Sequence, residues 1–195
     1  MMNNYNISGN LGEIFVKANF IAEEYQIPEV QNFCVALAIL TERDCVICQQ
    51  YAERGLLIDV SEMTYSLSVD ADLYEEVTGH RYPIQDEPVK TAESNDVVQE
   101  DVTDNKNKEE ENKDVNFVLV FTSNNESASY DTIPNSEELN RALEDANKRC
   151  RNAGVDYIDT DNLLFSILND EECSACKILK LFKYDIEEFK DILLY

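Results

Sequence analysis

Apolar residues recur along the N-terminal part of the chain with the period of an α-helix. They lie three, four, seven, ten, eleven and fourteen positions after Leu11, and so form one face of an amphipathic helix. The set is Leu11, Ile14, Phe15, Ala18, Ile21, Ala22 and Tyr25. Pro28 prevents a simple continuation. A second helix, apolar on nearly all sides and therefore central, is predicted from about Asn32 to Thr41. Two more helices are predicted to begin near Asp44 and after Asp59.

The same pattern occurs again after Ser136, where a helix is predicted to begin. Each apolar position of this helix lies 128 residues after one of the first set (139 − 11). These positions are Leu139, Ala142, Leu143, Ala146, Cys150 and Ala153. The match continues between Val155–Leu168, in which Thr160 can cap a helix, and Ile27–Leu40; beyond Cys176 the first copy is two residues longer. The repeat predicts two helical units of one architecture, related by a pseudo-two-fold axis and sharing a core.

The segment between the two units has a different pattern. Thr64–Val69 alternates between apolar and polar residues and predicts a strand, and the β-branched and aromatic run Asn116–Thr122 predicts a partner for it in a long hairpin. Between them, Asp70–Asp114 holds 15 acidic and 5 basic residues, and its centre, about Glu87–Lys113, is too charged to order itself, so we expect a disordered loop. The expected organisation is a first helical unit at 11–63, an acidic insert at 64–135 and a second helical unit at 136–195.

The chain is strongly acidic, with 40 Asp and Glu against 16 Lys and Arg and a net charge of −24. This charge argues against nucleic acid or an anionic membrane as a partner, because phosphate binding requires clustered basic residues. A basic protein or peptide fits better. The sequence contains no apolar run near the ~18 residues of a membrane span and does not begin like a signal peptide. We therefore expect a cytoplasmic protein with reduced cysteines.

The second unit resembles the Clp repeat, which occurs twice in the N-terminal domain of Clp-type AAA+ unfoldases. The family has a turn and helix of the type YIGTEHLLLGLL, and Tyr157–Leu168 reads YIDTDNLLFSIL. The first unit is similar mainly through its match to the second, so the resemblance covers about residues 11–63 and 136–194. It implies a mainly all-α fold of about eight helices in two pseudo-symmetric four-helix repeats. It also implies a non-enzymatic, chaperone-related module that binds proteins or peptides and needs no cofactor.

The chain departs from this family in three respects. It lacks the phosphate-binding motif G-x-x-x-x-G-K-[ST] of the ATPase modules, so we expect a stand-alone adaptor or regulator of a Clp machine, or the N-terminal piece of a longer unfoldase. The acidic insert replaces a short linker. In some relatives a glutamate of each repeat binds phosphorylated arginine; here that position is Asp161 in the second unit and Phe33 in the first. A symmetric two-carboxylate site is therefore not expected.

The candidate peptide site lies in the groove expected between the two halves. Its residues are Thr160, Asp161 and Asn162 of the second unit and their counterparts Asn32 and Phe33 of the first. The Asp161 carboxylate would either complement the helix dipole or receive a basic group of a peptide. Phe33 would contact an apolar side chain of the peptide if it is exposed, and would belong to the core if it is buried.

Two Cys-x-x-Cys pairs provide the alternative chemistry. Cys45, Cys48, Cys173 and Cys176 could hold zinc or act as redox thiols, but small buried residues at these positions of the repeat favour core packing. His80 is the only histidine, so a site built from several histidines is impossible. Glu137 and Glu138 lie where a helix begins and are interpreted as structural. A further alternative is an acidic inhibitor or immunity-type protein that blocks a basic enzyme.

Overall fold

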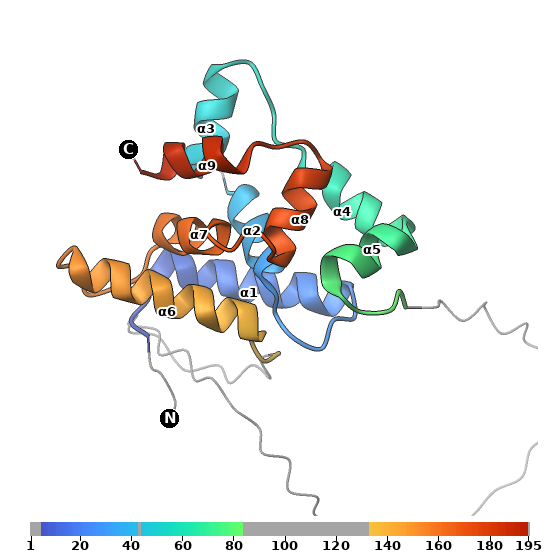
Figure 1. The fold of residues 1–195 in the computed structure, drawn as a ribbon, viewed down its shortest axis with the longest axis horizontal. Helices are drawn as coiled ribbons and strands as arrows, with labels where there is room; N and C mark the ends of the chain where they lie inside the picture. Colours follow the sequence, from blue (N-terminus) through green and yellow to red (C-terminus); the bar gives the residue numbers. More distant parts are fainter. Residues whose placement is uncertain (1–4, 43, 84–132, 195) are drawn as a thin grey trace, which may run out of the picture.

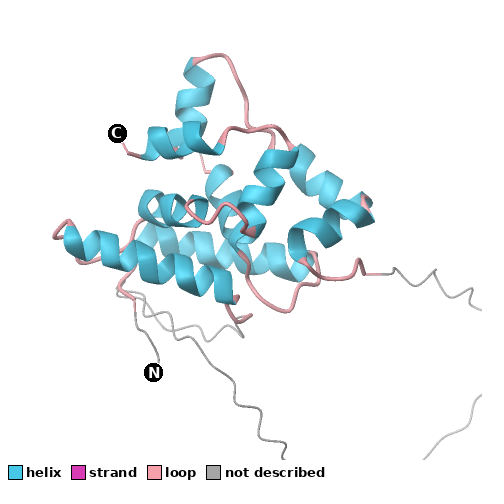
Figure 2. Cartoon of the chain, viewed as in Figure 1, coloured by secondary structure: helices cyan, strands magenta, loops and turns pink. Residues whose placement is uncertain are grey.

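The described part of the chain is entirely helical apart from loops and isolated bridges. The computed structural model describes residues 5–42, 44–83 and 133–194, and within them the chain forms nine α-helices and no strand (Figures 1 and 2). This confirms the predicted all-α fold. Among the described residues, none of the helices combines the length and the hydrophobicity needed to cross a membrane.

The helix boundaries reproduce the sequence repeat. The helices of the first half are α1 (Gly9–Glu24), α2 (Asn32–Leu40), α3 (Val46–Glu53), α4 (Val60–Val69) and α5 (Ala71–Thr78). Those of the second half are α6 (Glu137–Asn152), α7 (Thr160–Leu168), α8 (Ser174–Leu181) and α9 (Ile186–Leu193). The helices α6, α7 and α8 begin and end 128 residues after α1, α2 and α3 (137 − 9, 160 − 32, 174 − 46). Helix α9 begins 126 residues after α4 (186 − 60), as the two-residue difference predicts.

Equivalent caps explain why equivalent helices begin where they do. The Ser8 hydroxyl accepts a hydrogen bond from the Leu11 amide at 3.2 Å, and the Ser136 hydroxyl accepts one from the Leu139 amide at 3.2 Å. Each bond satisfies a backbone N–H group that the first turn of a helix leaves without a partner. Asp59 and Asp185 cap α4 and α9 in a corresponding way.

Two reciprocal backbone bridges join the halves. The Ser8 amide donates to the Ile158 carbonyl at 2.9 Å, and the equivalent Ser136 amide donates to the Val30 carbonyl at 2.9 Å. The segment before the first helix of each half therefore pairs with the segment before the second helix of the other half. This reciprocal arrangement is what a pseudo-two-fold axis requires, and it agrees with the predicted symmetry.

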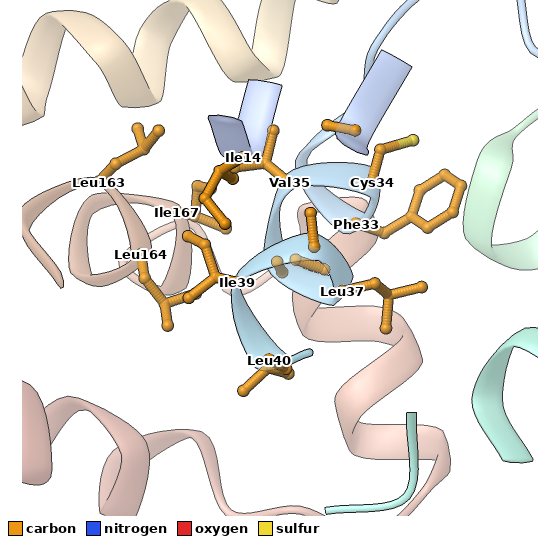
Figure 3. Close-up of a cluster of buried hydrophobic side chains, with 14 of the residues drawn as sticks. Ile14, Phe33, Cys34, Val35, Leu37, Ile39, Leu40, Leu163, Leu164 and Ile167 are labelled. Atoms are coloured by element: carbon orange, nitrogen blue, oxygen red, sulfur yellow. The ribbon is translucent and has the colours of Figure 1, made fainter. Parts of the chain in front are cut away.

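Helix α2 is the centre of the hydrophobic core. All nine of its residues are buried, and it packs against α1, α7 and α8. In Figure 3, Ile39 of α2 faces Leu164 and Ile167 of α7, whereas Phe33 points to the other side of α2. Burial of this much apolar surface is the main force that holds the two halves together. The predicted shared core is therefore present.

The strand predicted at 64–69 is wrong, because these residues belong to α4. The alternation of TYSLSV extends over too few residues to override the helical spacing of Met63 and Leu67, which are both 0% exposed. The Asp59 carboxylate also accepts a hydrogen bond from the Glu62 amide at 2.9 Å and so caps the helix. The strand predicted at 116–122 and the predicted disordered loop lie outside the described residues.

Helix α5 makes the two halves unequal. It packs on α4 and α8, and the described residues of the second half contain no equivalent helix. The Tyr74 hydroxyl donates to the Tyr25 carbonyl at 2.7 Å, and the Gln31 side-chain amide donates to the Thr78 carbonyl at 2.8 Å. These buried bonds fix α5 beside the beginning of α2 and cover the neighbouring α8.

Candidate functional site

The two predicted half-sites lie at equivalent helix N-termini but in different surroundings. Asp161 lies in the first turn of α7 with its side chain exposed. Its counterpart Phe33 lies in the first turn of α2 and is 0% exposed, as is the neighbouring Asn32. Of the five predicted residues, only Thr160, Asp161 and Asn162 therefore reach the surface.

At the second half-site, Asp159 caps the helix and leaves Asp161 uncommitted. The Asp159 carboxylate accepts hydrogen bonds from both the backbone amide and the side-chain amide of Asn162, each at 2.8 Å. The capping role that the sequence offered to Thr160 thus belongs to Asp159. Because Asp159 already accepts from the Asn162 backbone amide, the Asp161 carboxylate does not cap the helix and is available to another group.

The electrostatic surroundings of Asp161 are unfavourable to its charge. The pKa of Asp161 is raised above its usual value, mainly because neighbouring atoms partly exclude water from its carboxylate. The nearby carboxylates of Asp159 and Asp44 raise this pKa further by repulsion. Asp44 belongs to the first half, two residues before α3, so the acidic groups come from both halves. Within the described residues, no lysine or arginine forms an ion pair with Asp161. A cationic ligand group would relieve this repulsion.

The first half-site is closed by its own side chains. The Phe33 ring packs edge-on against Tyr25 with 6.3 Å between the ring centroids. The Asn32 side chain is also 0% exposed. This corrects the expectation that Asn32 and Phe33 contact a peptide, because neither side chain has any surface to offer.

Glu138 of α6 holds the closed half-site in place by hydrogen bonds to α2 and α8. Its carboxylate accepts hydrogen bonds from the Asn32 amide at 2.9 Å and the Ser174 amide at 3.1 Å, and also from the Ser174 hydroxyl. The Ser174 hydroxyl oxygen in turn accepts from the Phe33 amide at 3.0 Å. One carboxylate on α6 therefore satisfies the N-termini of α2 and α8 together. The sequence suggested only local dipole complementation for Glu138, and the pairing lacks a local signal because it spans 106 residues.

The cysteines do not assemble into the alternative zinc site. Within the described residues, no three Cys, His, Asp or Glu side chains lie close enough together to hold a metal ion. Each pair lies in the first turn of a helix, Cys45–Cys48 in α3 and Cys173–Cys176 in α8. The Cys48 thiol donates to the Leu40 carbonyl at 3.3 Å and the Cys176 thiol to the Leu168 carbonyl at 3.7 Å, so each pair is also tied to the end of the preceding helix.

Comparisons with known proteins agree with this architecture. Residues 107–182 match the family described as the Clp repeat (R) N-terminal domain. The fold is similar to the crystal structure of the N-terminal domain of the caseinolytic protease associated chaperone ClpD from Arabidopsis thaliana, with a TM-score of 0.55 and 13% identity over 97% of this chain and 92% of that one. None of the curated proteins matches the sequence significantly. Residues 107–182 are therefore similar to the Clp repeat, and the described residues share the fold of a Clp-type N-terminal domain.

Proposed function

We propose that this chain is a non-enzymatic docking module of the Clp type, which binds a basic segment of a partner protein at the Asp161 half-site. The observation that supports the proposal is the inequality of the half-sites: Asp161 is exposed with its carboxylate uncommitted, whereas Phe33 is 0% exposed. Binding would therefore use one half-site, with Thr160, Asp161 and Asn162 as the contact residues.

The chemistry of the half-site favours an arginine or lysine side chain. Asp161, Asp159 and Asp44 concentrate negative charge there, and the whole chain carries a net charge of −24. Such a field attracts basic partners and increases their rate of association, with a strong dependence on ionic strength. A partner of this kind would be a Clp-type ATPase, one of its adaptors or one of its substrates, and the chain would act as an adaptor or regulator.

The proposal predicts that a single arginine will be recognised at α7. We expect a short capped peptide with one central arginine to shift the NMR amide signals of Asp159–Leu163, Asp44 and Cys45 in the isotope-labelled protein. The same peptide with glutamine in place of arginine should leave these signals unchanged. Asp161→Lys should weaken binding about tenfold, because it removes a partner charge and adds a repelling one.

A matched control separates the half-site from the general acidity of the protein. Asp156→Lys makes the same change of charge at another exposed position just before α7, and should change the affinity by less than about twofold. Binding should also weaken on acidification at a higher pH than for an ordinary aspartate, because the pKa of Asp161 is raised. Equal weakening by both substitutions, or arginine-dependent shifts confined to α2, would contradict the proposal.

A further inference from the structure

The first turn of α3 contains two cysteines three residues apart. Cys45 is the residue immediately before the helix, and Cys48 is three residues further on. Residues at this spacing in a first helical turn have their side chains on the same side of the helix. The Cα atoms are then within the range that a disulfide spans, and Cys-x-x-Cys at a helix N-terminus is a common redox arrangement.

The equivalent pair in the second half differs in access to solvent. Cys173 and Cys176 are 2% and 0% exposed, because α8 is packed against α2, α5, α7 and α9. In the first half, Cys45 is 5% exposed but Cys48 is only partly buried. Helix α3 lies at the periphery, where its main contact is with α9 (Figure 1). The helix α5, which covers α8, has no equivalent over α3 among the described residues.

We propose that Cys45 and Cys48 form a redox site that is oxidised reversibly to a disulfide by low-molecular-weight disulfides such as glutathione disulfide. One cysteine thiolate attacks a sulfur of glutathione disulfide, which forms a protein–glutathione mixed disulfide and releases one glutathione thiolate. The second cysteine loses its proton and attacks the protein sulfur of the mixed disulfide, which closes the Cys45–Cys48 bond and expels a second glutathione thiolate. The two released thiolates take up the two protons from the cysteines, so one glutathione disulfide is reduced to two thiols.

The interaction between the thiols favours the first step. The neighbouring Cys48 lowers the pKa of Cys45, and the neighbouring Cys45 raises the pKa of Cys48. A thiolate stabilised in this way is the reactive form in disulfide exchange. The buried pair shows the same directions, with the pKa of Cys173 lowered and that of Cys176 raised. The difference in oxidation between the pairs must therefore come from the access of solvent to Cys48, because Cys45 is nearly as buried as Cys173.

The experiment compares both pairs in the same molecule. The full chain is reduced, incubated in buffers of graded glutathione to glutathione disulfide ratio, quenched with acid, alkylated and cut with trypsin. The tryptic peptide 44–54 contains Cys45 and Cys48, and the peptide 152–177 contains Cys173 and Cys176. We expect oxidation of peptide 44–54, seen as the loss of the mass of two hydrogen atoms, to be at least about tenfold faster than oxidation of peptide 152–177. Dithiothreitol should restore both alkylation sites of peptide 44–54.

Single variants test the order of steps. Cys48→Ser should accumulate a mixed disulfide of glutathione on Cys45, because the closing thiol is absent, and Cys176→Ser should leave oxidation of peptide 44–54 unchanged. Circular dichroism under each buffer shows that the fold is retained. The proposal is overturned if peptide 44–54 stays fully alkylatable, or if both peptides are oxidised at equal rates in the folded protein. The wild-type measurement decides this even if a variant fails to fold.

Discussion

Replacement of Phe33 by alanine will lower the free energy of unfolding by about 3–5 kcal/mol, the usual cost of removing a fully buried phenylalanine. The ring is 0% exposed and packs edge-on against Tyr25, so its loss leaves a cavity at the start of the central helix α2. Urea denaturation followed by circular dichroism measures the effect as a lower midpoint with an unchanged slope.

The equivalent position in the other half provides the control. Asp161→Ala removes an exposed carboxylate whose pKa is raised by its surroundings, so its ionised form opposes folding at neutral pH. The alanine variant should therefore match the wild type or be slightly more stable, within about 0.5 kcal/mol. If Phe33→Ala costs less than about 1 kcal/mol, the first half-site is able to open and the proposed division of roles between the halves is wrong.

The inequality between Phe33 and Asp161 was visible in the sequence, but its physical meaning was not. The 128-residue offset aligned the two positions and showed that only one of them carried a carboxylate. Whether Phe33 faced solvent or the core depended on α8, which packs on α2, and on the Tyr25 ring, which contacts Phe33. Side-chain exposure is a property of the neighbours that a residue acquires on folding, and local pattern does not contain it.

The repeated helices could be predicted because their signals are local. The apolar stripes of α1 and α6 and the caps Ser8 and Ser136 lie within a few residues of the helices that they specify. The error at Thr64–Val69 has the same origin, because a six-residue alternation fits a strand as well as a helix until the cap Asp59 and the buried Met63 are taken into account. Helix α5 was missed because its high charge resembled that of the acidic segment that follows.

Glu138→Ala should lower the free energy of unfolding by about 3 kcal/mol, although the residue was interpreted from the sequence as a simple helix-start acid. The substitution removes charge-assisted hydrogen bonds to the Asn32 amide, the Ser174 amide and the Ser174 hydroxyl. It leaves these donors without a partner at a largely buried junction, where each unsatisfied group costs about 1–3 kcal/mol. Urea denaturation gives the loss, and hydrogen exchange should show faster opening of the first turns of α2 and α8.

Two further variants distinguish this role from a local effect on α6. Glu138→Gln keeps one acceptor oxygen and should lose less stability than Glu138→Ala, because one of its two polar atoms can still accept from Asn32 or Ser174. Asn10→Ala makes the equivalent change on α1 (138 − 128), at an exposed position, and should change stability by less than about 0.5 kcal/mol. A pure dipole effect would instead be worth at most about 1 kcal/mol and would leave exchange in α8 unchanged. A loss of stability larger than this dipole effect is expected only if one carboxylate joins the two halves. The same holds for faster hydrogen exchange in both α2 and α8, which are distant from residue 138 in sequence.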